Sequence, residues 1–518
     1  MKKIRIYLGL LAMVIVATII TISCNKKLDT VNPNVVGTNE YFNTSSQLLE
    51  ATNAVYSAWH GSNLVGREWF FLHDLRSDDV ATGGSQLEAP RHQILLGVVD
   101  PSNPIMNSNW NSLYAVIHRA CTVTDNAPNV KDNPTLVARS VGEAEFLRGW
   151  AYFDLASQWG SVPVYTTTVK SPSDYQPKAA MSAVYAQAVK DLQAAAAILP
   201  GKTGTDLGRA TASAANAMLA RVLIQTGDYA GAKAALLKIP TAGADGYSLT
   251  ARYLDNFEEE TEFCAESIFE MIYVDKGDNN FNWGGNGVGD GPSADQTTVR
   301  NQEYCPVAWR NLIPSDRLLN EFESTVTGAA KTDPRYAFSI YQTGDTYDNN
   351  PGPGAILLDG DQNGMSSVVH GVTIKASWRK FMLIYKEDKG SAGFHPGSNN
   401  QRILRYAEVL LMLAECENEL GNIPAAVGYL NQVRARPTVA MPPYPTAQFP
   451  VTTKTDVVKA IMHEKTAEMA DEQVRNIDIM RWRAKGYFTT EPLSWYTPNK
   501  LYLPIPQSEL DNNPKATP

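Results

Sequence analysis

Two stretches of the chain share one pattern, a helix, a turn with a glycine and a second helix, and this pattern restricts the fold more than any other feature. The stretches are residues 211–239 and 403–433. Apolar side chains recur at i, i+3 and i+4 spacing in each helix. An alanine, Ala232 or Ala426, stands where the two helices would approach closely. Tetratricopeptide repeats, about 34 residues long, have this pattern, so the chain is predicted to be mainly α-helical.

Helical periodicity recurs along much of the remaining chain. The segments that show it are residues 45–60, 107–125, 134–159, 180–199, 211–225, 229–238, 403–420, 423–434, 455–471 and 472–483. Helix pairs of this kind stack only when several are adjacent. Because the two clear pairs lie far apart in the sequence, a long insertion must separate them.

The insertion is predicted over residues 241–400, which are rich in Gly, Asn, Asp, Trp and Tyr. Long irregular segments inside a compact protein are usually functional or disordered, and the aromatic content argues against disorder. The insertion divides the helical protein into an N-terminal part, residues 44–240, and a C-terminal part, residues 401–518. A second, smaller irregular stretch is expected over residues 68–104.

The N-terminus predicts export and a lipid anchor. Lys2, Lys3 and Arg5 precede an apolar run, residues 6–22, and Ser23 and Cys24 follow it. This order is typical of a secretory signal peptide, residues 1–23, cleaved before a lipid-bearing Cys24. A single membrane-spanning anchor is the alternative, since about 17 apolar residues is near the lower limit for a span. With the lipid, residues 24–43 become a tether, and the protein contacts the membrane only through its anchor.

Charge and motifs exclude several functions. The formal net charge is −9, and the sequence has no dense run of Lys and Arg beyond its first five residues, which argues against a nucleic-acid partner. His463 and Glu464 begin like a zinc-protease helix, but Ala467 stands where the second histidine is required. Nucleophile-elbow and phosphate-loop motifs are absent from the sequence. The chain is therefore predicted not to be an enzyme and to need no organic cofactor.

One segment resembles the first half of a calcium loop. Asp359, Asp361 and Asn363 alternate before Gly364, which is the ligand spacing that Ca²⁺ takes from such loops. The twelfth position, which should be Glu, is His370. A structural calcium ion and a plain Asx-rich turn are the two interpretations.

Several segments together resemble the SusD/RagB family of Bacteroidetes outer-membrane nutrient-binding lipoproteins, over nearly the whole chain. They are Glu143 to Arg148 with Tyr152, Phe153, Gly160 and Pro163; Arg405 to Glu415; Asn431, Val433, Arg434 and Arg436; Glu464, Glu468, Glu472, Arg475, Asp478, Arg481 and Trp482; and Leu503 to Pro506 with Glu509, Asn513 and Pro514. Lys465 departs from the arginine that is usual in the family.

The resemblance implies about four tetratricopeptide-like helix pairs and a loop-rich inserted region that carries the ligand site. It implies a lipoprotein at the outer membrane, on the cell surface, that captures oligosaccharides and delivers them to a SusC-like TonB-dependent transporter. Some members of the family take peptides instead, which is one alternative. A scaffold that binds only protein partners through its helical repeats is the other.

Candidate ligand-binding residues are aromatic and polar side chains in the irregular segments. Flat aromatic rings suit the apolar C–H face of a sugar, and a few fixed polar groups then read its hydroxyls. The candidates are Phe281, Trp283, Tyr304, Trp309 and Tyr347 in the insertion, and Trp69, Phe70, Asp78, Asp79 and Arg91 in the earlier stretch. Any one of these aromatic residues could instead belong to the core. Trp283 is favoured because its neighbours are Asn and Gly.

Glu464, Glu468 and Glu472 place three like charges at i, i+4 spacing on one predicted helical face. This arrangement is unfavourable by itself, so we interpret it as part of a structural ion-pair network with nearby arginines. The widely spaced Cys121, Cys264, Cys305 and Cys416 do not define a disulfide pattern.

Overall fold

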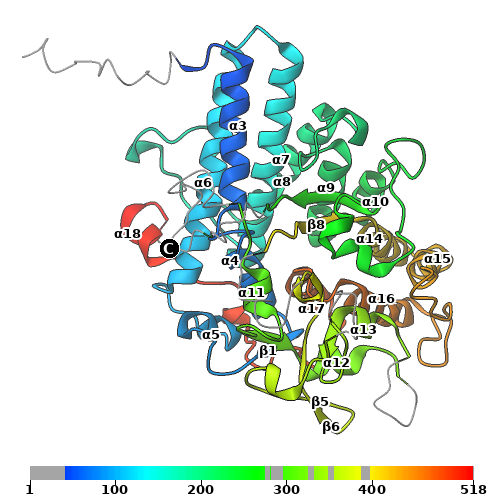
Figure 1. The fold of residues 1–518 in the computed structure, drawn as a ribbon. Coiled ribbons are helices and arrows are strands. Elements are labelled where there is room, and N and C mark those ends of the chain that lie inside the picture. Colours follow the sequence, from blue (N-terminus) through cyan, green and yellow to red (C-terminus); the bar gives the residue numbers. More distant parts are fainter. Residues whose placement is uncertain are drawn as a thin grey trace, which may run out of the picture.

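The computed structural model describes residues 41–274, 281, 296–324, 332–347, 355–386 and 397–516. Its N-terminal part is built on long helices that lie side by side (Figure 1): α3 (Ser45–His60), α6 (Pro104–Asn126), α7 (Pro134–Trp159) and α8 (Met181–Ile198). Helix α7 is buried along its second half, because Trp150 and neighbouring apolar residues face other helices on every side.

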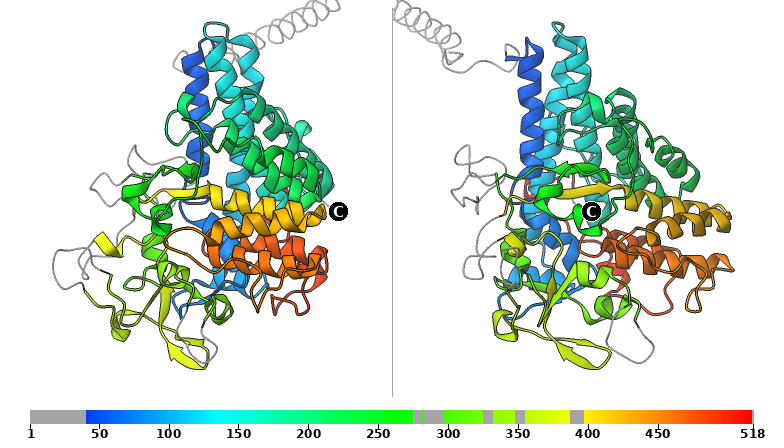
Figure 2. Two further views of the ribbon diagram at one scale, coloured as in Figure 1. Left: turned by 90° about the vertical axis from the view of Figure 1, so that its right-hand side faces the viewer. Right: turned by 45° about the vertical axis from the view of Figure 1, so that its right-hand side comes forward.

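The predicted helix pairs stack on one another, which confirms a mainly α fold of tetratricopeptide type. The pair α9 (Ala212–Thr226) and α10 (Tyr229–Leu236) packs on the pair α14 (Tyr406–Glu419) and α15 (Ile423–Arg434), through α10 and α14. Gly227 ends α9 with a φ of 82°, and Gly421 follows α14 with a φ of 85°. These are left-handed conformations that glycine adopts without strain. Helix α16 (Lys454–Met469) then packs on α14 and α15, as the rows of yellow and orange helices in Figure 2 show.

Three regions differ from the sequence prediction. Residues 68–104 are not irregular throughout, because they contain α4 (Glu68–Leu75) and α5 (Ala89–Leu95). Every residue of α4 is buried, so the helix lacks the polar face that makes periodicity visible. Strand β8 (Gln401–Arg405) takes the residues predicted to begin α14, because it pairs with β2 (Ser267–Met271). Helix α17 (Arg475–Ala484) begins late, because Asp471 and Gln473 have φ values of 63° and 57°.

The insertion contains short elements, which lie beside and below the stacked helices in the left view of Figure 2. Two of its antiparallel sheets pair β4 with β7 and β5 with β6, and its strand β3 pairs with β1 from the N-terminal part. These strands are β1 (Val80–Thr82), β3 (Leu312–Pro314), β4 (Ile340–Gln342), β5 (Ser367–Val369), β6 (Val372–Ile374) and β7 (Ala376–Trp378). The remaining helices are α11 (Arg300–Tyr304), α12 (Asp316–Glu321), α13 (Arg335–Ser339) and, near the C-terminus, α18 (Gln507–Asn512).

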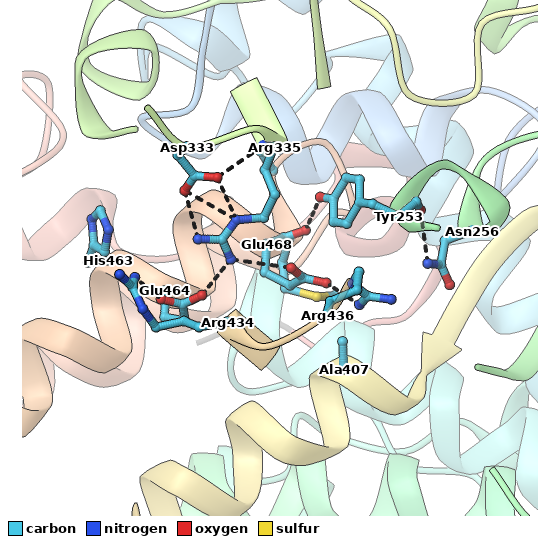
Figure 3. Close-up of polar contacts among 12 residues, drawn as sticks. Tyr253, Asn256, Asp333, Arg335, Ala407, Arg434, Arg436, His463, Glu464 and Glu468 are labelled. Carbon is cyan, nitrogen blue, oxygen red and sulfur yellow. Dashed lines mark hydrogen bonds and ion pairs between the residues drawn. The ribbon is translucent and has the colours of Figure 1, made fainter. Parts of the chain in front are cut away.

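A buried network of ion pairs joins the insertion to the C-terminal helices (Figure 3). Glu468 on α16 accepts hydrogen bonds from Arg405 at 2.7 Å, Arg436 at 2.9 Å and Arg335 at 3.3 Å. Arg335, from the insertion, also donates to Glu464 at 2.5 Å. All of these side chains are buried. Glu464 and Glu468 on α16 are therefore part of a structural ion-pair network, as predicted. Glu472 lies beyond the end of that helix and joins the network through Arg405 and Lys380.

Glu266, which accepts hydrogen bonds from Arg405 and Arg436, is a further buried carboxylate of the network. Burial alone would raise the pKa of Glu266, but Arg436 and Arg405 outweigh it and lower that pKa to about 2. Lys380 extends the network towards the insertion, because its ammonium group donates to Glu472 at 2.8 Å and to the carbonyl oxygens of Glu468 and Ala470.

The four cysteines of the described residues are free thiols, and three of them, Cys121, Cys305 and Cys416, are buried. Among the helices of the described ranges, none is both long enough and apolar enough to cross a membrane. The stability of the described part therefore depends on packing and the ion-pair network, without a disulfide between these thiols.

Candidate functional site

A cavity of about 510 Å³ opens within the insertion. Three chain segments surround it, namely residues 252–260, 341–347 and 379–385. The residues that line it are Arg252, Leu254, Phe257, Glu258, Glu260, Tyr341, Thr346, Tyr347, Arg379, Met382 and Tyr385. The lining combines aromatic walls with a few charged groups, as ligand sites commonly do.

The short sheet of β4 and β7 positions two of these segments. Tyr341 on β4 pairs with Ser377 on β7. Arg379 follows β7 directly, and its backbone N–H donates to the carbonyl oxygen of Ser339 at 2.8 Å. After β4, Gly344 turns the chain with a φ of 100°, a conformation that favours glycine. This turn brings Tyr347 back to the cavity.

The cavity wall rests on the buried ion-pair network. The Lys380 ammonium group lies 4.6 Å from the centre of the Phe257 ring, and the Arg405 guanidinium lies 5.7 Å from it. The Phe381 ring also packs edge-on against Phe257 at 5.2 Å. Phe257 is thereby held between the cavity and the network, so the network fixes one wall of the cavity.

Hydrogen bonds fix the polar groups of the cavity. Arg252 pairs with both carboxylate oxygens of Glu258, one of them at 2.7 Å. The hydroxyl of Tyr385 donates to Glu260 at 2.7 Å, and Lys386 pairs with the same carboxylate at 2.7 Å. Burial raises the pKa of Tyr385 and of Tyr341 above the ordinary tyrosine value. These groups are oriented donors and acceptors that a polar ligand can use.

The same contacts disfavour hydrolysis in this cavity. A glycosidase needs one carboxyl group that stays protonated near neutral pH and a second carboxylate across the scissile bond. Burial works to raise the pKa of Glu260, but hydrogen bonds from Lys386 and Tyr385 outweigh it and lower the pKa. Glu258 is engaged by Arg252. Both carboxylates of the lining are therefore engaged by cations.

Tyr347 is the predicted ligand residue that the structure brings to the cavity. The structure places four other predicted aromatic residues, Trp69, Phe70, Phe281 and Tyr304, in the hydrophobic core and away from the cavity. Trp69 donates its indole N–H to Asp154 at 2.6 Å, and Tyr304 donates its hydroxyl to Asp74 at 2.9 Å. Tyr347 is also buried, with 3% of its surface exposed, so it contributes to the cavity wall and not an open platform.

The predicted polar residues of the earlier stretch have structural partners. Asp78 accepts hydrogen bonds from Arg475 on α17 at 2.7 and 2.9 Å, and Asp79 pairs with Arg317. Arg91 is buried and pairs with Glu68 at 2.5 Å. Asp78, Asp79 and Arg91 therefore fasten α4, α5 and the neighbouring loop to other elements, and they do not line the cavity.

Two predicted positions, Trp283 and the lipid-bearing Cys24, lie outside the described residues. Trp309 is half-buried in the turn after α11, and its backbone N–H donates to Gln302 at 3.1 Å. It does not line the cavity.

The candidate calcium segment forms a short 3₁₀ turn, Asp359–Asp361. Asp361 accepts a hydrogen bond from the backbone of Leu358 at 2.8 Å. The Lys375 ammonium group donates to the carbonyl oxygen of Gln362 at 2.7 Å and lies 3.8 Å from the Asp359 carboxylate. Asn363 contributes its backbone oxygen to Arg310. Within the described part of the chain, three or more His, Cys, Asp or Glu side chains do not gather as a metal site.

Sequence reasoning missed Tyr341, Tyr385, Phe257 and Arg379, which line the cavity. Tyr341 belongs to a strand of three residues and Tyr385 to a 3₁₀ turn, η7 (Ile384–Lys386), and both elements are too short to show periodicity. The available signal was the run of aromatic and charged residues around Tyr385, inside the predicted insertion.

Comparison with known proteins gives matches over most of the chain. A model described as "SusD family" matches residues 265–491. A model described as "Starch-binding associating with outer membrane" matches residues 19–224. Among curated proteins, "SusD-like protein P2" of Formosa agariphila is 25% identical over 94% of this chain and 94% of its own length. "SusD-like protein P25" of the same organism is 24% identical over 95% and 94% of the two chains.

Solved structures share the fold. A SusD superfamily protein from Bacteroides vulgatus superposes with a TM-score of 0.73 at 22% identity, covering 92% of this chain and 99% of the other. Surface glycan-binding protein A from Bacteroides thetaiotaomicron, solved in complex with laminarihexaose, gives a TM-score of 0.68 at 21% identity, with coverage of 90% and 98%.

Proposed function

Because this chain belongs to the SusD family, we propose that it is a cell-surface glycan-binding lipoprotein that captures oligosaccharides for nutrient uptake. The observation that carries the proposal is the cavity of the insertion, where the half-buried ring of Tyr385 stands beside charged side chains and is backed by the buried rings of Tyr341, Tyr347 and Phe257. Aromatic rings pack on the apolar faces of sugars, and the charged groups accept or donate hydrogen bonds at the hydroxyls.

Two relatives in fold support this ligand class. One was solved in complex with laminarihexaose, and another is described as a laminarin-binding SusD-like protein. Both ligands are glycans, and both proteins match more than nine-tenths of their own length to this chain. The inference that this chain also takes a glycan rests on this shared fold together with its own cavity.

The remaining parts of the proposal concern location and partner. Cleavage before Cys24 and lipidation of its thiol would hold the protein at the outer membrane, in keeping with the description of the family model that matches residues 19–224. The captured oligosaccharide would then pass to a SusC-like TonB-dependent transporter. The protein would act by binding alone, because Glu258 and Glu260 are engaged by cations.

The proposal is tested by affinity gel electrophoresis of the mature protein against plant, host and microbial polysaccharides. We expect retardation by at least one glycan, and loss of that retardation in Tyr385→Ala, which removes one ring of the cavity. Tyr429→Ala is the matched control, since it removes a half-buried tyrosine from α15, outside the cavity. Trp283→Ala tests in parallel whether that residue contributes.

Three other outcomes would contradict parts of the proposal. Retardation that Tyr385→Ala leaves intact would place the glycan elsewhere on the protein. Absence of retardation by any glycan, with binding to a peptide pool, would favour a peptide-capturing protein. Binding to neither would favour a scaffold of helical repeats.

The lipid anchor is tested by labelling with a fatty acid. The label on the protein should be sensitive to globomycin and should be lost in Cys24→Ala.

A further inference from the structure

The charges that line the cavity are paired, with one exception. Glu258 is held by Arg252, which also contacts Asp255 at 3.1 Å. Glu260 is held by Lys386, which also pairs with Glu259. Each carboxylate of the lining therefore already has a cationic partner.

Arg379 is the exception, because no carboxylate of the described residues lies within ion-pair distance of it. Its guanidinium donates one hydrogen bond, to the carbonyl oxygen of Ala337 at 2.9 Å, and lies 5.0 Å from the centre of the Tyr341 ring. The side chain is half-buried and lines the cavity. Arginine has five N–H donors in a planar fork that suits the two oxygens of a carboxylate or sulfate. Most of these donors remain for a ligand.

The surrounding acidic groups are the main objection to an anionic ligand. Asp255, Glu259 and Asp345 lie near the cavity without lining it. The first two are in ion pairs, and Asp345 accepts a hydrogen bond from the backbone of Gln342 at 2.8 Å. Burial raises the pKa of Asp345, and the nearby Arg379 works to lower it. Arg379 therefore faces this half-buried carboxylate from beyond ion-pair distance, and a direct charge-assisted hydrogen bond to an anionic group of the ligand would be stronger.

We propose, on the basis of the glycan-binding function proposed above, that the cavity selects a sugar with an anionic group, a uronate carboxylate or a sulfate ester, and that Arg379 binds this group. The half-buried ring of Tyr385 packs on the sugar, and the buried rings of Tyr341 and Tyr347 support the cavity wall behind it. Arg379 supplies the specificity, because the charge of a paired arginine such as Arg252 is already compensated by carboxylates.

The test is calorimetric titration of the mature protein with three hexasaccharides: a neutral one, laminarihexaose; a uronate, hexagalacturonate; and a sulfated one from κ-carrageenan. The quantity compared is the ratio of anionic to neutral affinity. A charge-assisted hydrogen bond predicts at least one anionic ligand bound about tenfold or more tightly than the neutral one. The two anionic arms decide between carboxylate and sulfate.

Variants assign the selectivity to Arg379. Arg379→Gln should bring the ratio close to one, and Arg379→Lys should restore part of it, because lysine keeps the charge but loses the planar fork. Arg119→Gln is the matched control, because Arg119 on α6 is also a half-buried arginine that donates to a backbone carbonyl oxygen, that of Ala54 at 2.7 Å, but it lies outside the cavity. This variant should keep the wild-type ratio. Circular dichroism confirms that each variant is folded.

Three outcomes would overturn the inference. A wild-type ratio near one refutes it, and the glycan-binding function still stands if Tyr385→Ala abolishes binding of the neutral ligand. An unchanged ratio in Arg379→Gln also refutes it, since another residue would then read the anion. Absence of binding by any oligosaccharide overturns both the inference and the proposed function.

Discussion

Removing the charge of Glu468 should destabilise the protein far more than removing a surface carboxylate. Glu468 is completely buried, and three arginines, Arg335, Arg405 and Arg436, donate to it. Glu468→Gln keeps the size of the side chain but leaves these guanidinium groups with one carboxylate fewer. Breaking a buried ion pair by removing one partner costs about 3–5 kcal/mol, and the three donors place this substitution towards the upper end of that range.

The assay is equilibrium unfolding in urea, followed by tryptophan fluorescence. Glu491→Gln is the matched control, because Glu491 pairs with Arg483 at the surface and its side chain is 33% exposed. A surface pair contributes about 0–1 kcal/mol, so the control should unfold almost as the wild type does. Equal free energies of unfolding for the two variants would refute the view that the network fastens the insertion to the C-terminal helices.

Three further predictions concern titration and thiol access. The pKa values of Glu266 and Glu323 are lowered from 4.5 to about 2. The stability that these two carboxylates contribute is therefore present above pH 4.5 and lost as the pH falls towards 2. The midpoint of thermal unfolding should fall over that pH range. Burial works to lower the pKa of His463, but hydrogen bonds to Glu321 and Glu323 outweigh it and raise the pKa to about 9. The stability that protonated His463 contributes is therefore complete below pH 6.5 and lost as the pH rises through 9. His463→Gln should remove this alkaline loss of stability, and an identical loss in the variant would contradict the assignment to His463. Cys264 is half-buried and should react with iodoacetamide in the native protein before the buried Cys121, Cys305 and Cys416, as peptide mass spectrometry can check.

The aromatic candidates show where sequence reasoning reached its limit. Trp69 and Tyr304 looked like platforms because they stand in segments without visible periodicity, yet both belong to the core. Cores and sugar sites both use aromatic rings, and the difference is whether one face of the ring stays uncovered. That difference depends on elements remote in sequence, such as Asp154 beside Trp69 and Asp74 beside Tyr304.

The cavity was predictable as a region but not as a set of residues. The composition of residues 241–400 indicated a long functional insertion, and the three segments of the cavity lie inside it. Tyr341, Arg379 and Tyr385 come together through a sheet with three residues in each strand. The pairing energy of so short a sheet is small, so no local sequence pattern specifies it, and the buried network behind Phe257 holds it in place.

The sequence by itself determined the helix pairs, because their periodicity, their glycine turns and the small residues at their crossings are local properties that each pair carries alone. Glu464 and Glu468 likewise required buried arginine partners, since like charges four residues apart on one helix are unfavourable without them. Only the tertiary structure decided which partners these were, and that α10 packs on α14 across the insertion. It also decided that Arg379 lines the cavity without a carboxylate of the described residues at ion-pair distance, while Asp78, Asp79 and Arg91 are engaged elsewhere. These outcomes depend on contacts between residues far apart in the sequence, which form only when the whole chain has folded.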